Sequence, residues 1–239
     1  MSQVTPLFPN VPIQQFAPSS DNSPADRTAR NKRGVADSSK RWSPGVITVS
    51  LDLANKKSQA LVIDALKEWA HHTPGLQFEI VEGKRGDIRV SDDEGFTGSW
   101  SVIGTDALLV DEDQPTLHLD RTDNSKQLRT HALHEFGHAL GLLHEHQHPQ
   151  STLDWDEQAV RDYFVSERFP AELVQEQILD PLTGPDVQST AYDPQSVMHY
   201  PFPAHLSRKG HGTSENFFLS PGDQEAIRRL YRPNIPGMS

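Results

Sequence analysis

Three histidines occur at fixed spacing within one short segment, and this spacing restricts both the local fold and the chemistry of the chain. The segment from His134 to His144 reads HEFGHALGLLH. On a helix, residues four positions apart project from the same face, so His134 and His138 can reach a single ion. A straight helix would carry His144 away from that face. Glycine tolerates positive φ, so the chain can turn at Gly141 and bring His144 back to the ion.

The ligand chemistry of this segment is that of zinc. Imidazole nitrogens bind zinc at about 2.0–2.1 Å, and three of them leave the fourth position open, as in catalytic sites. The chain has no cysteine, so no thiolate competes for this role. Glu135 lies beside the first ligand, where it can take a proton from water and pass it to a leaving amine. The sequence predicts one catalytic Zn²⁺ ion bound by these three histidines. We interpret the neighbouring histidines as residues outside the ligand set: His131, His146, His148 and His199.

Hydrophobic periodicity predicts an α+β fold. Runs of β-branched and apolar residues predict strands at 46–51, 76–81 and 87–90, and a short edge strand at 116–119. Helical spacing predicts a first helix with Ser58 as its N-cap, which ends before Thr73. Further helices are predicted at 125–140, 156–164 and 223–231. Strands and a helix come first, then a central helix, then a loop-rich second half.

The two ends of the chain differ in composition from its centre. Residues 1–40 are rich in Pro, Ser, Asn, Gln and Asp and show no sustained period. We interpret them as a disordered tail or pro-segment. The catalytic domain is expected at 41–233, followed by a tail at 234–239.

Charge and hydropathy argue against several partners. The formal net charge is -11, whereas nucleic-acid binding needs clustered Lys and Arg, so we expect no nucleic acid. No run approaches the roughly 18–20 apolar residues that span a bilayer, so we expect no membrane partner. The N-terminus lacks the pattern of an ordinary export signal. Localisation therefore stays open between a non-standard secretion route and an intracellular site.

The zinc segment resembles the extended motif of the metzincins, and two further stretches resemble the astacin family. These are HEH at 144–146 and SVMHY at 196–200. WSPGVI at 42–47 is similar to the family's opening strand, and GSWS at 98–101 is similar to a family motif that usually reads GCWS. The resemblance covers about residues 42–231. It implies a two-lobed metzincin domain: an N-terminal twisted mixed sheet with two long helices, a loop-rich C-terminal lobe, and a cleft between them.

The resemblance also implies an activity. A member of this family is a zinc-dependent endopeptidase that hydrolyses internal peptide bonds of proteins by Glu-assisted attack of zinc-bound water. It implies that Met198 lies in a tight turn beneath the zinc. It implies that Tyr200 is a mobile phenol that can ligate zinc in the resting enzyme and stabilises the oxyanion during turnover. For Glu145 it suggests a link to the mature N-terminus; the alternative is a solvated carboxylate.

Weaker resemblances to the family concern the processing of the chain and its substrate preference. Lys32 and Arg33 precede the opening strand at a distance similar to a processing site in the family, although a plain exposed basic pair is an equal alternative. In family zymogens a pro-segment aspartate caps the zinc, and three aspartates are available for this role: Asp21, Asp26 and Asp37. Arg208 and Lys209 follow the Met-turn where the family builds its primed-side pocket, which suggests a preference for acidic residues; the alternative is a solvated loop.

The chain departs from the family at several positions. Pro74 and Ser99 stand where members usually have Cys, and His148 stands where Arg is common. Two other hypotheses compete with a general peptidase. A catalytically silent zinc-binding or protein-binding module would have lost Glu135 or a ligand, and all four residues are present. An effector that cleaves one host protein is favoured by the missing export signal and missing cysteines. For either kind of protease we expect protein or peptide substrates and a monomer.

Overall fold

The computed structural model describes residues 34–232, and a parallel sheet dominates their N-terminal half. The seven strands of this region are β1 (Val35–Asp37), β2 (Gly45–Asp52), β3 (Leu76–Val81), β4 (Ile88–Ser91), β5 (Trp100–Ser101), β6 (Leu117–His118) and β7 (Val187–Ser189). The four α-helices are α1 (Lys56–Ala70), α2 (Ser125–Ala139), α3 (Glu157–Ser166) and α4 (Pro221–Leu230). None of these helices is long and apolar enough to cross a membrane.

The main sheet has five strands in the order β3-β2-β4-β6-β5. The first four are parallel, and β5 runs antiparallel to β6. Parallel neighbours need a crossover, and α1 supplies it between β2 and β3. The expectation that residues 116–119 form an edge strand is wrong, because β6 lies between β4 and β5. The edge on that side of the sheet is the very short β5, which lies within the GSWS segment at 98–101.

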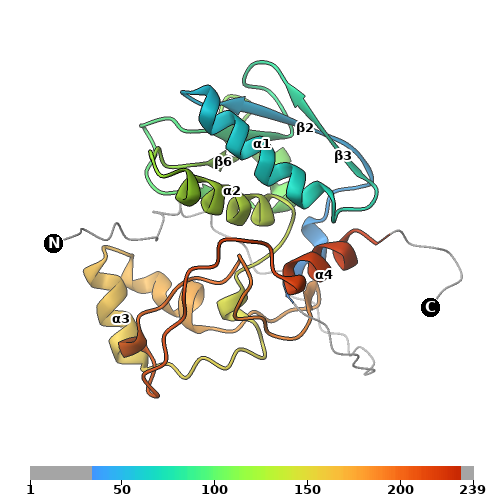
Figure 1. Ribbon diagram of the computed structural model, residues 1–239. Helices are drawn as coiled ribbons and strands as arrows, with labels where there is room; N and C mark the ends of the chain where they lie inside the picture. Colours follow the sequence, from blue (N-terminus) through green and yellow to red (C-terminus); the bar gives the residue numbers. More distant parts are fainter. Residues whose placement is uncertain (1–33, 233–239) are drawn as a thin grey trace, which may run out of the picture.

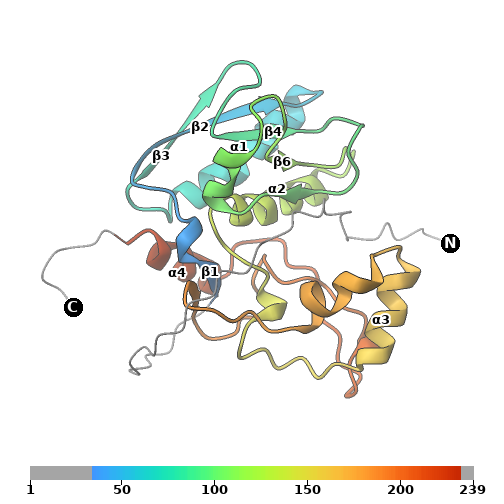
Figure 2. The ribbon, with the colours of Figure 1, turned by 180° about the vertical axis from the view of Figure 1, so that it is seen from behind.

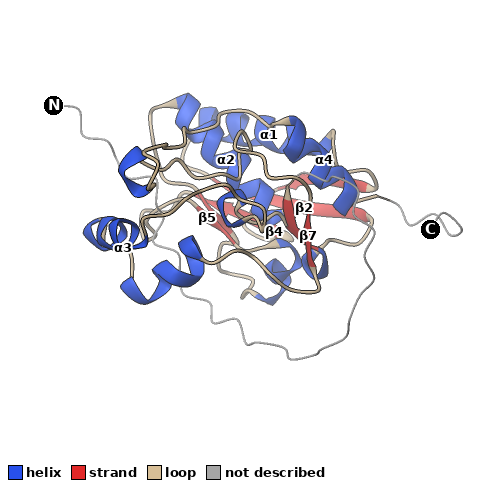
Figure 3. Cartoon of the chain, turned by 90° about the horizontal axis from the view of Figure 1, so that it is seen from below, coloured by secondary structure: helices blue, strands red, loops and turns tan. Residues whose placement is uncertain are grey.

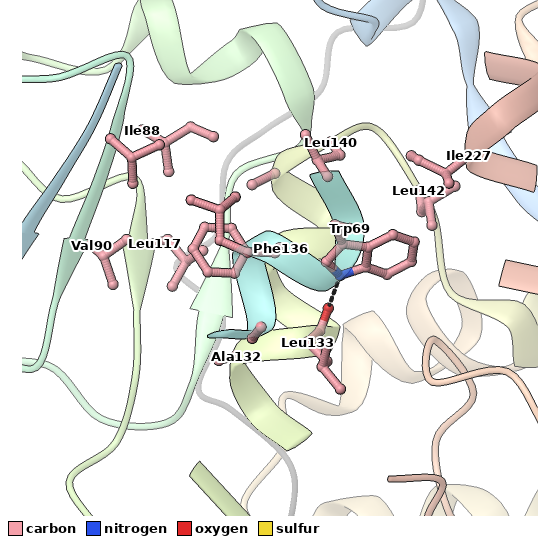
Figure 4. Close-up of a cluster of buried hydrophobic side chains, with 14 of the residues drawn as sticks. Trp69, Ile88, Val90, Leu117, Ala132, Leu133, Phe136, Leu140, Leu142 and Ile227 are labelled. Carbon is pink, nitrogen blue, oxygen red and sulfur yellow. Dashed lines mark hydrogen bonds between the residues drawn. The ribbon is translucent and has the colours of Figure 1, made fainter. Parts of the chain in front are cut away.

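Helices α1 and α2 lie side by side against one face of the sheet (Figure 1). Seen from behind, the sheet stands in front of them (Figure 2). Trp69 of α1 is fully buried, and its indole Nε1 donates a 2.8 Å hydrogen bond to the carbonyl of Leu133 (Figure 4). Phe136 of α2 fills the space toward Val90 and Leu117 of the sheet. This core therefore fixes the position of α2, which carries the first two predicted zinc ligands.

The start of α1 differs from the prediction. Its N-cap is Asn55, whose side-chain oxygen accepts a hydrogen bond from the backbone N–H of Ser58 at 2.8 Å. Ser58 is therefore a residue of the first turn and not the cap. Asn and Ser cap helices about equally well, so propensity alone does not choose between them. The ends of the other predicted helices lie within two residues of those observed.

A second apolar cluster forms the core of the C-terminal lobe. It contains Val160, Phe164, Val174, Ile178, Phe202 and Leu206. Loops make up most of this lobe, as the view from below shows (Figure 3). Helix α4 follows in the chain, yet Ile227 and Leu230 pack into the first cluster and so tie the two halves together. The two-lobed α+β architecture predicted from the sequence is confirmed.

A short strand precedes residue 41, where the catalytic domain is expected to start. Strand β1 pairs antiparallel with β7, with Val35 opposite Ser189. Val35 is 2% exposed, and residues 38–40 form a single 3-10 turn. The folded region therefore starts at least six residues before residue 41. Residues 1–33, including Asp21, Asp26, Lys32 and Arg33, and residues 233–239 lie outside the described part of the chain.

Candidate metal centre

The helix that carries His134 and His138 ends at the turn that redirects the chain toward His144. The backbone N–H of Leu142 donates to the carbonyl of Gly137, and that of Gly141 donates to the carbonyl of His138. This pair of hydrogen bonds is a Schellman motif, whose C′ residue needs a left-handed conformation. Gly141 has φ +94°. The turn predicted at this glycine is therefore present, and it returns His144 to the helix end.

The three histidines converge on one point. Each can offer a ligand atom such that all three atoms lie within 4.8 Å of one another. The Nδ1 atom of His134 lies 2.8 Å from the carbonyl oxygen of Val197, and that of His138 lies 2.9 Å from the carbonyl oxygen of Leu142. A carbonyl accepts only, so Nδ1 carries the proton in both rings and Nε2 keeps its lone pair.

The donor set fits a tetrahedral zinc ion. The Nε2 atom of His134 is buried and has no hydrogen-bond partner among the described residues. The Nε2 atoms of His138 and His144 face each other at 3.0 Å. Two nitrogens on one tetrahedral zinc would lie about 3.3 Å apart. A metal ion explains why buried lone pairs are left without a proton donor and are aimed at one another.

Burial also keeps these imidazoles neutral. Desolvation lowers the pKa of His138 to about 4 and the pKa values of His134 and His144 well below their ordinary range. At neutral pH the three rings are therefore neutral, each with one protonated nitrogen and one free lone pair. Only this form has the lone pair that a metal needs.

A tight turn beneath the histidines carries Met198. The backbone N–H of His199 donates to the carbonyl of Ser196, which closes the turn. Met198 is 2% exposed and its sulfur lies against α2. A Cβ atom at Gly137 would overlap this sulfur. The glycine inside the HEFGH segment is therefore explained by close packing against Met198 and not by backbone conformation.

Asp223 anchors this turn, a contact that no local sequence pattern predicts. Its carboxylate accepts hydrogen bonds from the backbone N–H of Val197 at 2.9 Å and of Ser220 at 2.8 Å. It also accepts from the hydroxyl of Ser196. Ser220 and Asp223 form the capping box of α4. The S-x-x-D pattern before an apolar helix predicts such a cap, but not that its carboxylate also reaches the turn.

Asp223→Ala is expected to lower the free energy of unfolding by about 3 kcal/mol or more. Two backbone N–H groups and one hydroxyl would lose a buried acceptor, at about 1–3 kcal/mol each. Urea denaturation followed by tryptophan fluorescence measures the change. Asp223→Asn keeps one acceptor oxygen and should lose clearly less. Equal stability of the alanine variant and the parent would show that this anchor does not hold the turn.

The same carboxyl group gives the stability a defined pH dependence. Burial raises the pKa of Asp223 from 3.8 to about 6, against hydrogen bonds that lower it. Because the folded-state pKa is the higher one, the favourable contribution is complete at low pH and is lost as the pH rises through about 6. The stability of the parent relative to Asp223→Asn should therefore fall between about pH 4 and 6 and then level off. A relative stability that increases over this range would contradict the assignment.

Glu135 and Tyr200 border the same pocket as His134. Glu135 is 5% exposed, and burial raises its pKa well above the ordinary range. The ring of Tyr200 stacks on His134 with centroids 5.4 Å apart and on His146 with centroids 5.1 Å apart. It also lies 4.3 Å from the ring of His144. A buried carboxyl group with a raised pKa and a phenol therefore stand together beside the ligand set.

Glu145 is buried and linked to the N-terminal strand. It is 1% exposed, and its Oε1 atom accepts a hydrogen bond from the backbone N–H of Asp193 at 2.7 Å. Burial raises its pKa to about 9, against the lowering effect of backbone hydrogen bonds from Asp193 and Val35. The alternative of a solvated carboxylate is therefore wrong.

The remaining residues singled out in the sequence lie elsewhere. The imidazoles of His148 and His199 contact backbone carbonyls, of Thr190 and Tyr200 respectively, and neither joins the ligand cluster. Asp37 caps the turn at Ser39 and does not line the pocket. Arg208 and Lys209 have largely exposed side chains near Asp154, outside the pocket lining, so the solvated-loop alternative describes them.

Comparison with known proteins agrees with this geometry. The Astacin family of peptidases matches residues 34–213, which is more than half of the chain. The structure of myroilysin is 31% identical, with 84% of this chain and 100% of that chain covered and a TM-score of 0.78. The hatching enzyme HCE-1, a zinc-protease from the medaka fish Oryzias latipes, is 18% identical over 81% of this chain and 95% of its own, with a TM-score of 0.52. The latter likeness shows the fold alone. A search of curated protein sequences finds no match.

The family match, together with the three convergent histidines, places the chain among the metalloendopeptidases of the metzincin class. The chain belongs to the astacin family, and it is a zinc-dependent endopeptidase that acts on proteins.

Proposed function

We propose that Glu135 is the general base and general acid of this peptidase, with zinc on His134, His138 and His144. Two observations support this assignment: the three histidines converge on one point, and the first of them, His134, lines the same pocket as Glu135. Zinc, when bound, supplies a Lewis acid that polarises the scissile carbonyl and acidifies a water. Glu135 takes the proton of the attacking water and delivers it to the departing nitrogen. The raised pKa of its carboxyl group favours the step in which it holds that proton.

We assign to Tyr200 the role of stabilising the carbonyl oxygen of the substrate, on which negative charge develops during hydrolysis. Its ring stands between His134 and His146, so the phenol is held next to the ligand set. Burial and the nearby Glu135 raise its pKa, so the hydroxyl keeps its proton and can donate a hydrogen bond. Met198 and Gly141 support the site by packing and by the turn. The test of the whole assignment is peptide hydrolysis measured together with zinc content, for the parent and for variants described in the Discussion.

We propose that residues 1–33 are a pro-segment and that Glu145 receives the new N-terminus. The backbone N–H of Gly34 donates to the carbonyl of Ala191, and the carbonyl of Gly34 accepts from Thr190. The next residue, Val35, contributes a backbone hydrogen bond to Glu145. A chain that starts at Gly34 would therefore place its α-amine near a buried carboxylate. The Lys32–Arg33 pair precedes that position directly.

Removing residues 1–33 is expected to raise kcat/KM for peptide hydrolysis. The comparison is between zinc-loaded 34–239 and full-length protein with Lys32→Gln and Arg33→Gln, which blocks cleavage at the basic pair. Removal of residues 234–239 serves as a control, since that end is not assigned to inhibition. Equal rates for the two proteins would refute the pro-segment proposal and leave the catalytic assignment standing.

We also propose that the enzyme works as a monomer. The exposed large hydrophobic residues of the described region fall in four groups: Val46 and Ile80 on the paired strands β2 and β3, Leu108 and Leu109 in the 3-10 helix at 104–109, Val165 in α3, and Phe218 in the loop before α4. Stable protein–protein interfaces need a contiguous apolar centre, which such a distribution does not supply. Light scattering on the purified protein at micromolar concentration tests this, and a dimer mass would overturn it.

A further inference from the structure

The pocket beside the first zinc ligand carries negative charge outside its catalytic groups. Asp120 and Glu215 line it together with Glu135 and Tyr200, and no Lys or Arg is among its lining residues. Asp120 follows β6 and Glu215 follows the Met-turn, so the two carboxylates come from different lobes. The walls of the substrate pocket therefore present two acidic side chains contributed by both lobes.

Neither carboxylate is paired within the described residues. No hydrogen bond or ion pair to the side chain of Asp120 or Glu215 occurs there, although nearby cations exist. Lys126 acts on Glu215 at longer range, while its Nζ atom lies 3.3 Å from the ring centroid of Phe217. Arg121 pairs instead with Asp92 and Glu94. Half-buried carboxylates without partners leave part of their desolvation cost uncompensated.

Glu215 is held firmly in place. The side-chain amide of Asn216 donates to the carbonyls of Pro194 and Ser196, at 3.0 and 2.9 Å. Two residues before Glu215, the hydroxyl of Thr213 donates to the carbonyl of Tyr200 at 2.9 Å. The segment is thus fastened on both sides to the turn that carries Met198 and Tyr200. Preorganisation of this kind lets a charged group discriminate between ligands without a reordering cost.

A third polar group in the same pocket also lacks a partner. The Nδ1 atom of His131 lies 3.1 Å from the hydroxyl of Ser99, which in turn accepts from the backbone N–H of Asp120. The Nε2 atom of His131 is buried without a hydrogen-bond partner among the described residues. Ser99 stands where the family resemblance places a cysteine. In this chain its hydroxyl contacts His131 of α2 and the backbone of Asp120, which follows β6.

We propose that this pocket is a subsite for a lysine or arginine side chain next to the scissile bond, with Glu215 as the main specificity residue and Asp120 as the second. The inference rests on the proposed catalytic role of the adjacent residues. A cationic side chain of the substrate would offset the desolvation cost of both carboxylates. It would interact with Glu215 more strongly than the distant Lys126 does. The preference is the opposite of the acidic one that Arg208 and Lys209 would have supported.

The test uses the zinc-loaded full-length enzyme and a peptide library derived from a digested proteome, with cleavage sites identified by mass spectrometry. Lys and Arg should be enriched at one position within two residues of the cleaved bond. In matched peptides, kcat/KM for Lys at that position should exceed the value for Glu by roughly 10- to 100-fold. Glu215→Lys should reverse the preference at that position only, and Glu215→Gln should weaken it if the reversal variant fails to fold.

Glu112→Gln is the matched control, because Glu112 is a largely exposed acid outside the pocket. It should leave the cleavage pattern unchanged. Cleavage of many peptides with no cationic enrichment, or a pattern that Glu215→Lys does not alter, would overturn the subsite and leave the peptidase assignment intact. If no peptide in the library is cleaved, with or without residues 1–33, the proposed catalytic roles fail and the subsite fails with them.

Discussion

Glu135→Gln is expected to lower kcat/KM for peptide hydrolysis by roughly 10²–10⁴-fold while leaving bound zinc unchanged. Glutamine has nearly the same size and keeps a side-chain oxygen, but it cannot accept and then deliver a proton. Zinc content should persist because the ligand cluster consists of His134, His138 and His144 alone among the described residues. Hydrolysis of a quenched fluorescent peptide, together with metal analysis of the same preparation, measures both quantities.

Glu157→Gln is a suitable control for this experiment. Glu157 is an exposed carboxylate in the first turn of α3, in the other lobe. This variant should retain full activity and zinc. Near-parental rates for Glu135→Gln would exclude Glu135 as the proton carrier. Loss of both zinc and activity would instead indicate that the carboxylate is needed to build the site.

His138→Ala is expected to weaken zinc binding by roughly 100- to 1,000-fold and to abolish detectable hydrolysis. Zinc binds structural sites with about 10–16 kcal/mol, which over three or four ligands is about 2.5–5 kcal/mol for each one. The remaining imidazoles of His134 and His144 would stay in place, because packing and backbone hydrogen bonds position α2 and the following turn. Competition with a fluorescent zinc chelator at pH 7.5 measures the affinity.

His71→Ala tests whether the loss is specific to the site. His71 is an exposed residue at the end of α1, and its ring Nδ1 atom lies 2.7 Å from the carbonyl oxygen of Lys67 in the same helix. Its replacement should leave zinc affinity and activity unaltered. An unchanged affinity for His138→Ala would rule out the three-histidine ligand set. Thermal unfolding with and without added zinc should shift for the parent and for His71→Ala, and little for His138→Ala.

Local features of the chain were predictable because they depend on neighbours in sequence. The spacing of His134 and His138 follows from the helical period, and the apolar stripe of α2 from the same period. The turn at Gly141 follows from the tolerance of glycine for positive φ, and the observed φ of +94° agrees. Errors arose where two local signals compete equally, as at Asn55 and Ser58, or where strand order depends on long-range pairing, as for β6.

The acidic pocket is the clearest case of what local patterns do not contain. Asp120, His131 and Glu215 carry no common spacing in the chain. They meet because β6 and α2 are fixed by one core while Asn216 fastens the Glu215 segment to the Met-turn. Arg208 and Lys209 lie nearer the turn in sequence, yet their loop leads them outward to Asp154. Distance in sequence from the Met-turn therefore does not predict which residues line the pocket.

The sequence by itself determined the family, the α+β class, the zinc ligands' spacing and the carboxylate beside them. The ligand spacing and the carboxylate are encoded within one helix and its terminating glycine. Only the tertiary structure decided that Glu145 is buried against Asp193 and Val35, that Asp223 anchors the turn of Met198, and that two acids face the pocket. These contacts join segments far apart in the chain. Their geometry depends on how whole elements pack, and short-range propensity carries no information about that.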